Sequence, residues 1–461
     1  MPKAALTGRG LIIMVFLIKT AQLLLCFCIL ILLHEGGHFF FAKLFGIRVS
    51  KFCLFFDPWI KPLKLFTYKG TDYCIGWLPL GGYVSIEGMV DESTSADKLG
   101  KEVQPWEFRA KPAWQRLLVM VGGVLVNFLL ALFIYAMVFF AWGETYVPQR
   151  NMTEGYVFNE EAQALGFRDG DIILAADGVA FKSHSGDIYR AISTAHECTV
   201  LREGREVGIA LPGNLNMLDM IQSSPRFMDL RQGNVVDSVI AGGPAAKAGM
   251  MKGDRIVSVN GKETASGNAV MYELSVVGDV VKSENLKKAR KTTLVVARGE
   301  AFDTLTAEVG EDAKLNILFH STLADYKTVT EHYGFFESFP AGISYGWNVL
   351  CGYVSDLKYL FTKDGAKSVG SFGTIGSLFP ATWDWGRFWE LTAFISLMLA
   401  FMNFLPIPAL DGGYIFLTLL EVITRRRFPD KVVEVLNTIG MWLLIALMAY
   451  AIFNDIDRFL L

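Results

Sequence analysis

The sequence predicts a polytopic α-helical membrane protein that carries a tandem of α+β domains between its second and third membrane-spanning helices. Of the 461 residues, 52% are hydrophobic and only 19% are charged, and the mean hydropathy is +0.35. This composition is too apolar for an ordinary soluble enzyme. The apolar residues are concentrated in separate runs, and the long stretch between the second and third runs contains a repeated unit. The formal net charge of −3 indicates no nucleic-acid partner.

Four apolar runs are candidates for membrane-spanning helices, because roughly 20 apolar residues cross a bilayer as a helix. The runs are residues 11–33, 117–142, 391–405 and 435–453. The first run contains Lys19 and lacks a small-residue cleavage site, so we expect a membrane span and not a cleaved signal peptide. With their flanks, the predicted helices are residues 11–40, 116–142, 388–413 and 435–453.

The distribution of lysine and arginine predicts the orientation. Basic residues are frequent in the segment 43–116 and in the short loop that contains Arg425, Arg426 and Arg427. The positive-inside rule places both segments in the cytoplasm. The stretch from about 143 to 340 then lies on the opposite side of the membrane.

Cysteine spacing gives little guidance. The six cysteines form no CxxC pair, no zinc-ribbon spacing and no recognisable disulfide framework. We expect most of them to be small buried apolar residues.

The stretch between the second and third spans contains two copies of one pattern, at residues 162–181 and 242–264. Each copy has a small-residue helix, a Gly-Asp turn, a short strand and then an Asp-Gly or Asn-Gly pair that favours a hairpin. Gly170 and Gly253 suit left-handed backbone before the strand. Internal similarity of this kind predicts tandem domains, at 143–230 and 231–322.

Both units resemble PDZ domains, which bind extended peptides at a sheet edge. Two structural β-domains without tight peptide binding remain the alternative. The following segment, 323–387, is expected to be an amphipathic linker region. Its Gly- and Ser-rich part, 368–380, is either irregular backbone that gates access to the membrane or a simple loop.

The stretch "HEGGH" places His34, Glu35 and His38 at the end of the first apolar run. Histidines four residues apart lie on one face of a helix, so both imidazoles can reach one metal ion, with the glutamate beside them as general base. Ionisable residues at membrane depth usually mark function, although a polar cap at the membrane interface is the alternative. Gly36 and Gly37 disfavour a helix and suggest the close approach of another backbone.

A catalytic zinc site needs a third protein ligand and an open position. The stretch "NFLPIPALDGG" supplies Asp411, which we expect at the end of the third span and at the depth of His34. Pro406 and Pro408 break the helix there. A turn-capping role is the alternative for Asp411. The sequence therefore predicts Zn²⁺ bound by His34, His38 and Asp411, with Glu35 as the catalytic residue.

These motifs together resemble the site-2 protease family of intramembrane zinc metalloproteases. The matching pieces are "HEGGH", "LPLGGYV" (78–84), "GGVLVNF" (122–128), the paired PDZ-like units and "NFLPIPALDGG" (403–413), in the family's order. Within this resemblance, "LPLGGYV" corresponds to a membrane-reentrant β-hairpin in the cytoplasmic segment 41–115.

The resemblance also implies residues that hold the substrate. They are Gly81, Gly82 and Tyr83 at the hairpin edge, and the amides of Asn127 and Asn403 within the spans. A plain surface hairpin is the alternative for the first group, and helix-to-helix hydrogen bonding is the alternative for the two asparagines.

The function implied is a zinc metalloendopeptidase of the bacterial inner membrane that cleaves single-span proteins within the lipid bilayer after an earlier cut. The active site would face the cytoplasm and the PDZ-like domains the periplasm, where they would filter substrates. Expected substrates are an anti-sigma factor, in a stress response, or signal-peptide remnants. The alternatives are a non-enzymatic membrane scaffold whose PDZ domains bind extracytoplasmic peptides, and a metal transporter.

Overall fold

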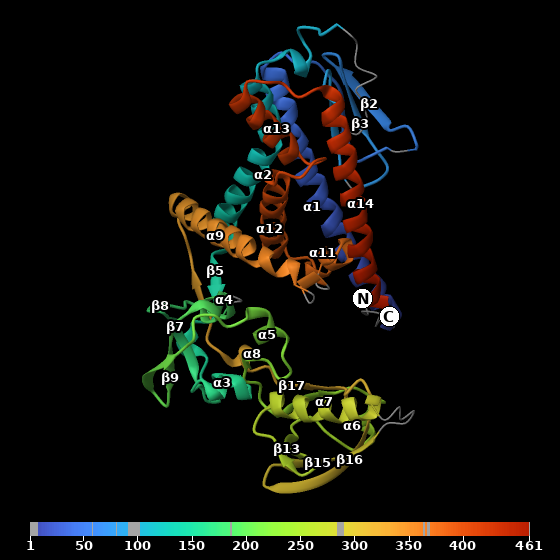
Figure 1. Cartoon of the computed structure of the whole chain (residues 1–461). Helices are drawn as coiled ribbons and strands as arrows, with labels where there is room; N and C mark the ends of the chain where they lie inside the picture. The colour runs from blue at the N-terminus through green and yellow to red at the C-terminus, as the bar shows by residue number, and fades with distance from the viewer. Residues whose placement is uncertain are drawn as a thin grey trace. The chain divides into compact units, whose positions relative to one another are not determined.

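The computed structural model describes residues 8–57, 59–79, 81–90, 102–184, 187–283, 290–362, 365–366 and 369–460. The chain forms two compact units, of which one combines residues 1–144 with 332–461 and the other spans 145–331. Figure 1 colours the chain by residue number, from blue at the N-terminus to red at the C-terminus.

The first unit is mainly helical. Its helices are α1 (Gly8–Leu44), η2 (Phe108–Ala110), α2 (Ala113–Trp142), α9 (Phe335–Asp356), η4 (Leu357–Phe361), α11 (Phe372–Leu378), α12 (Trp385–Phe404), α13 (Asp411–Thr424) and α14 (Asp430–Leu460). Helix α2 is the central element, because it packs against α1, α9, α12 and α13. Glycines allow the closest of these contacts: a Cβ on Gly37 of α1 would lie 2.3 Å from the carbonyl oxygen of Gly122 in α2. Small residues at such crossings let membrane helices approach closely.

Three helices in the described part of the chain are long and apolar enough to cross a membrane. They are Ile13–Leu44, Ala113–Trp142 and Asp430–Arg458. These spans and the sheets described below agree with a membrane protein that carries β-rich domains. The expected third span corresponds to α12, which has 20 residues and is not among the three, so the total of four stays a prediction.

The expectation that Asp411 ends the third span was wrong. Helix α12 ends at Phe404, and Asp411 is the first residue of the separate helix α13. The two helices are joined by the Pro-containing stretch of the motif. A Cβ on Gly412 would lie 1.9 Å from the carbonyl oxygen of Leu405, so only glycine lets the chain fold back on itself at this point. The prolines end one helix, and the glycines allow the next helix to begin beside it.

The segment after α1 forms a four-stranded sheet where the sequence indicated a hairpin. Its strands are β1 (Val49–Leu54), β2 (Leu63–Tyr68), β3 (Thr71–Ile75) and β4 (Tyr83–Ile86), in the order β2-β3-β1-β4. Among the described residues, strand β4 pairs antiparallel with β1 alone and lies at the edge of the sheet. Of the predicted hairpin stretch 78–84, Leu80 lies outside the described residues.

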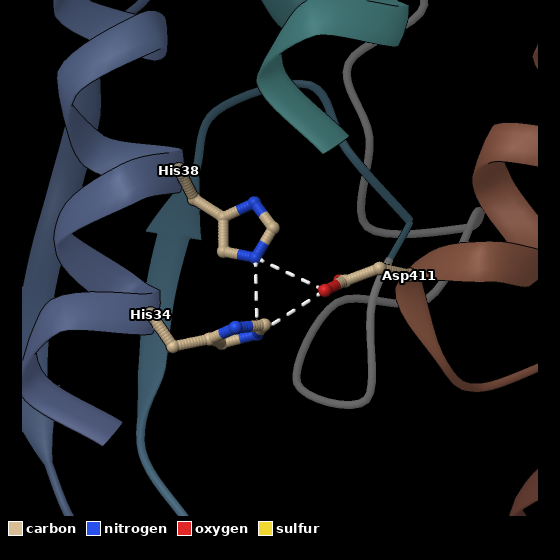
Figure 2. Close-up of side chains that lie close together, drawn as sticks. All are labelled: His34, His38 and Asp411. Atoms are coloured by element: carbon tan, nitrogen blue, oxygen red, sulfur yellow. Dashed lines mark hydrogen bonds and ion pairs between the residues drawn. The ribbon is translucent and has the colours of Figure 1, made fainter. Parts of the chain in front are cut away.

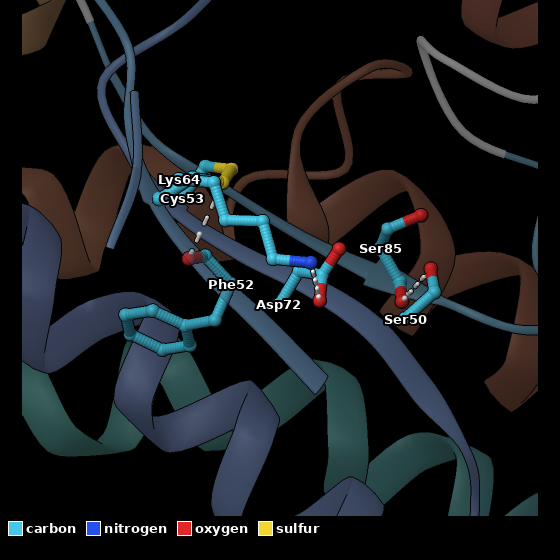
Figure 3. The surroundings of a disulfide bond; sticks show 7 residues. Ser50, Phe52, Cys53, Lys64, Asp72 and Ser85 are labelled. Carbon is cyan, nitrogen blue, oxygen red and sulfur yellow. Dashed lines mark hydrogen bonds and ion pairs between the residues drawn. A yellow bond between two sulfur atoms is a disulfide. The ribbon is translucent and has the colours of Figure 1, made fainter. Parts of the chain in front are cut away.

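Two of the six cysteines form a disulfide, which corrects the expectation that none would be recognisable. Strands β1 and β3 are parallel neighbours with Cys53 directly opposite Cys74, and the two sulfurs are bonded. Figure 3 shows this bond beside the ion pair of Lys64 and Asp72, 2.7 Å long, which joins β2 to β3. The pairing could not be seen in the sequence because it depends on a parallel register between strands that are not consecutive.

The second unit contains two copies of one topology. Its strands are β5 (Glu144–Tyr146), β6 (Tyr156–Phe158), β7 (Ile172–Ala176), β8 (Val179–Ala180), β9 (Glu197–Arg202), β10 (Arg205–Ala210), β11 (Met228–Leu230), β12 (Val236–Val239), β13 (Arg255–Val259), β14 (Lys262–Glu263), β15 (Arg290–Arg298), β16 (Ala301–Val309), β17 (Ile317–Phe319) and β18 (Val329–Glu331). Its helices are η3 (Gln149–Asn151), α3 (Glu160–Ala164), α4 (Asp187–Thr194), α5 (Met217–Gln222), α6 (Pro244–Lys247), α7 (Gly267–Ser283) and α8 (Thr322–Asp325). The sheet orders β8-β7-β9-β10 and β14-β13-β15-β16 are equivalent.

The same polar contact stabilises both copies. In the first copy, Arg202 at the end of β9 donates to the buried carboxylate of Asp171. In the second, Arg298 at the end of β15 donates in the same way to Asp254. Each aspartate also accepts the backbone amide three residues earlier. The Asp of the repeated Gly-Asp turn is therefore an anchor between the turn and the neighbouring strand.

The repeated turns have the backbone that their residues predict. Gly170 and Gly253 have φ of +93° and +91°. Both residues of Asp177-Gly178 and of Asn260-Gly261 have positive φ, as a two-residue hairpin requires. Each copy has its own hydrophobic core. The PDZ assignment and the boundaries 143–230 and 231–322 stay predictions.

Candidate metal centre

Helix α1 presents both histidines of the HEGGH stretch on one face. It continues to Leu44, so the motif lies within the helix and not at its end. The Nε2 atoms of His34 and His38 lie 3.3 Å apart. This is the arrangement that an i, i+4 spacing predicts.

The carboxylate of Asp411 completes the cluster from the start of α13. Its Oδ2 lies 3.1 Å from Nε2 of His34 and 3.2 Å from Nε2 of His38. Figure 2 shows the two rings and the carboxylate pointing toward one another. The three side chains come from opposite ends of the chain and meet at one point. The cluster is the one group of three potential metal-ligating side chains found in the described part of the chain.

The geometry of these three atoms fits zinc. Tetrahedral zinc with bonds of about 2.0–2.1 Å to nitrogen and oxygen separates neighbouring ligand atoms by roughly 3.4 Å, which is close to the separations observed. The Oδ2 atom of Asp411 is also buried and has no partner of hydrogen-bond geometry among the described residues, although two imidazole nitrogens lie within 3.2 Å. Two imidazoles and one carboxylate are a known donor set for catalytic zinc, and they leave a coordination position open.

Helix α2 forms one wall of the cluster. The Nδ1 atom of His38 lies 2.8 Å from the carbonyl oxygen of Val119. One turn further, a Cβ on Gly123 would lie 2.3 Å from Nε2 of His38 and 2.8 Å from Cε1 of His34. The absence of a side chain at Gly123 therefore makes room for both rings. The sequence singled out the stretch 122–128, but it could not indicate this role, because the role depends on how α1 and α2 cross.

The edge strand β4 lies against Glu35. The carboxyl group of Glu35 interacts with the backbone of Val84 and electrostatically with the cluster. A Cβ on Gly82 would lie 3.5 Å from Cγ of Glu35 and 2.7 Å from Cγ2 of Ile31. The ring of Tyr83 stacks on that of Phe56, with ring centroids 6.4 Å apart. The structure thus brings Gly82, one of the predicted edge residues, beside the predicted general base.

The two asparagines lie near the cluster, and Gly81 packs against Phe56. A Cβ on Gly81 would lie 2.4 Å from the Phe56 ring. The Nδ2 atom of Asn127 lies 3.4 Å from Nδ1 of His34, and Nδ2 of Asn403, near the end of α12, lies 3.5 Å from Nε2 of the same ring. The two asparagines therefore lie beside the cluster, whereas Gly81 and Tyr83 contact the Phe56 ring.

The two glycines inside HEGGH have different surroundings. A Cβ on Gly37 would meet the α2 backbone, whereas a Cβ on Gly36 would have nothing within 4 Å. The expected close approach of another backbone therefore holds for Gly37, and that backbone belongs to α2.

The fold and the cluster together define a membrane metallopeptidase with a zinc cofactor. The chain belongs to Peptidase family M50, whose family model matches residues 22–447. This match covers nearly the whole chain and spans both ends of the metal cluster.

Comparison with curated proteins gives relatives that match this chain over nearly their whole length. The chain is 28% identical to a Vibrio cholerae protein named as a zinc metalloprotease, over 93% of this chain and 96% of that protein. It is 28% identical to the regulator of sigma-E protease RseP of Escherichia coli, over 96% of this chain and 99% of that protein. A Thermotoga maritima protein, also named as a zinc metalloprotease, is 27% identical over 93% of this chain and 97% of that protein.

Proposed function

We propose that this metalloprotease cleaves single-span membrane proteins within the bilayer, after an earlier cut has removed most of their outer domain. The observation that carries the proposal is the convergence of His34, His38 and Asp411 within helices of a membrane protein. A metallopeptidase with two of its ligands, His34 and His38, on a membrane-spanning helix is expected to meet its substrate at membrane depth.

In this proposal His34, His38 and Asp411 hold the zinc ion. Zinc, when bound, lowers the pKa of a water molecule and polarises the scissile carbonyl group. Glu35 takes the proton from the attacking water and delivers it to the leaving nitrogen, because its carboxyl group lies beside the cluster. This is general acid–base catalysis by one positioned carboxylate.

The substrate would be held in extended form at the edge of β4. A helix hides its carbonyl groups in internal hydrogen bonds, so a transmembrane substrate has to unwind before cleavage. Among the described residues, strand β4 is the last strand of its sheet, and an extended peptide can be added at such an edge. Gly81, Gly82 and Tyr83 are at the start of this edge, and Asn403 lies on the metal side of His34, where its amide can hold the substrate backbone.

The two repeated domains would exclude substrates whose outer part is still long. They form a separate compact unit, residues 145–331, inserted between α2 and α9. We assign them to the periplasm and the active site to the cytoplasmic side of a bacterial inner membrane. The name of the Escherichia coli relative, regulator of sigma-E protease, suggests an anti-sigma factor as a substrate, in a stress response. Signal-peptide remnants also cross the membrane once, and we propose them as a second kind of substrate.

A non-enzymatic scaffold is not favoured, because membership of a peptidase family and a complete donor set both indicate catalysis. The deciding experiment is cleavage of a truncated single-span substrate by purified protein in detergent, with and without a zinc chelator. Glu35→Gln should keep one equivalent of zinc and lose cleavage, by a factor of about 10²–10⁴ for loss of a general base. Full cleavage by this variant would disprove the role of Glu35. Cleavage that persists after zinc removal would disprove the proposed site.

A further inference from the structure

Three residues of α2 face the two histidines, and they are spaced by four positions. Val119 contacts His38 through its carbonyl oxygen, Gly123 lies against both rings, and Asn127 contacts His34 through its side chain. Residues four apart lie above one another on a helix. One stripe of α2 therefore contacts both imidazoles.

The contact at the first position fixes the state of His38. Its Nδ1 lies 2.8 Å from the Val119 carbonyl oxygen, which can only accept, so Nδ1 carries the proton and Nε2 keeps its lone pair for a metal. Hydrogen bonds of this kind set the tautomer and the orientation of metal-binding histidines. His34 needs an equivalent acceptor at its own Nδ1.

Asn127 is placed to provide that acceptor. Asn127 is 1% exposed, and its Oδ1 is buried without a hydrogen-bond partner among the described residues. Its Nδ2 lies 3.4 Å from Nδ1 of His34. The two ends of a side-chain amide are nearly isosteric, so half a turn about the terminal bond brings Oδ1 to this ring nitrogen. That rotation pairs the buried oxygen with the N–H of His34, and an unpaired buried acceptor is otherwise unfavourable.

The two asparagines contact opposite ends of the His34 ring. Asn403 lies at Nε2, the atom that faces Asp411, whereas Asn127 lies at Nδ1. A group that holds the substrate has to reach the metal side of the ring. The backbone of Asn127 is held by α12 as well, because its carbonyl oxygen accepts a hydrogen bond of 2.8 Å from the Ser396 hydroxyl.

We propose that Asn127 is a positioning residue for the zinc ligand His34 and not a substrate-binding residue. Its Oδ1 accepts the Nδ1 proton, so the Nε2 lone pair points at the metal. The inference rests on the proposed zinc site formed by His34, His38 and Asp411. Helix α2 then positions both histidines. The carbonyl oxygen of Val119 accepts from His38, and the side-chain amide of Asn127 accepts from His34.

The test measures zinc affinity as well as cleavage, in full-length protein in detergent. Zinc binding is followed by competition with a chromogenic chelator. Asn127→Leu, which has similar size but no acceptor, should weaken zinc binding about 10- to 100-fold, as for other partners of metal-binding histidines. Asn127→Asp restores the acceptor and should bind zinc within a few-fold of the unaltered protein. Ser396→Ala is the matched control, because it loosens the same helix contact and keeps the acceptor.

The outcomes separate the alternatives. If Asn127→Leu binds zinc normally and raises only the KM for substrate, Asn127 holds the substrate and the proposal is wrong. If that variant does not fold, Asn127→Asp decides: normal zinc affinity supports the proposal, and weakened affinity overturns it. His34→Ala tests the underlying site separately. If it retains zinc at normal affinity, the zinc site itself is wrong, whatever Asn127 does.

Discussion

The Nε2 atom of His34, in the first helix of the chain, lies 3.1 Å from Oδ2 of Asp411, the first residue of α13. This contact joins the HEGGH stretch to the stretch that contains Asp411, although the two are remote in the sequence. The two side chains are proposed ligands of one zinc ion. Residues on α1, α2, α12 and β4 surround this contact, and the predictions below test what several of them do.

Replacement of the third ligand should remove the metal without unfolding the protein. In Asp411→Asn the amide is a far weaker zinc ligand than the carboxylate, so we expect loss of the stoichiometric zinc and of cleavage. Metal content of purified protein, measured by atomic emission, checks this. Asp430→Asn, at the start of the next helix, is the control and should retain zinc. A zinc-loaded Asp411→Asn protein would contradict the ligand assignment.

The two glycines of HEGGH should respond in opposite ways to alanine. Gly37→Ala places a Cβ 2.3 Å from the Gly122 carbonyl oxygen, and such overpacking costs about 1–3 kcal/mol. Gly36→Ala meets nothing within 4 Å and gains about 1 kcal/mol of helix propensity. Thermal unfolding in detergent should therefore show a lower midpoint for the first variant only. Equal midpoints would contradict the α1–α2 contact.

Gly123→Ala should disturb the metal centre more than the fold. Its Cβ would lie 2.3 Å from Nε2 of His38, so the ring has to move away from the metal position. We expect at least a tenfold loss of zinc affinity, measured by chelator competition. Leu129→Ala, on the exposed face of the same helix, should bind zinc normally. Unchanged affinity in Gly123→Ala would show that the rings do not pack against α2 as described.

The second repeat should lose stability in acid. Asp254 is buried, which raises its pKa, but hydrogen bonds from Arg298 and from the Met251 amide outweigh burial and lower the pKa below the usual value. A depressed folded-state pKa stabilises the fold above the unfolded pKa of about 3.9, and this contribution is lost as the pH falls through the folded value.

Hydrogen exchange of β13 and β15 in the full chain measures this effect. Exchange should stay constant between pH 5 and 8, after correction for the intrinsic rate, and should rise below about pH 4. Asp254→Asn should exchange faster throughout and lose this acid-dependent step. An acid step that persists in the variant would assign it to another group.

Deletion of the second unit tests substrate filtering. Removal of residues 145–331, which form a compact unit of their own, should let the membrane unit cleave substrates that have not been cut beforehand. The comparison is the rate on cut and uncut forms of one substrate, before and after deletion. Uncut substrate that stays resistant, while cut substrate is processed, would rule out the filter.

Local chemistry made part of the molecule predictable. The i, i+4 histidines needed only a helix to converge, and the Asp-Gly and Asn-Gly turns needed only their own backbone preferences. Asp411 was identified as a ligand candidate, but its position at the start of α13 was not, because proline and glycine mark a break without showing where the chain resumes as a helix.

The remaining features depend on contacts between distant segments. The Cys53–Cys74 bond requires the parallel pairing of β1 with β3. The role of Gly123 requires the crossing of α1 and α2. Helix α12 lies in the place of a predicted span, but it is not among the three helices of the described chain that are long and apolar enough to cross a membrane.

The separation of the ligands along the chain has a consequence for biosynthesis. During translation the ribosome delivers HEGGH long before Asp411. A nascent chain therefore carries an incomplete donor set until Asp411 has been made. A fragment that stops short of α13 has the two histidines without the third ligand, so it lacks the complete site that we propose for hydrolysis.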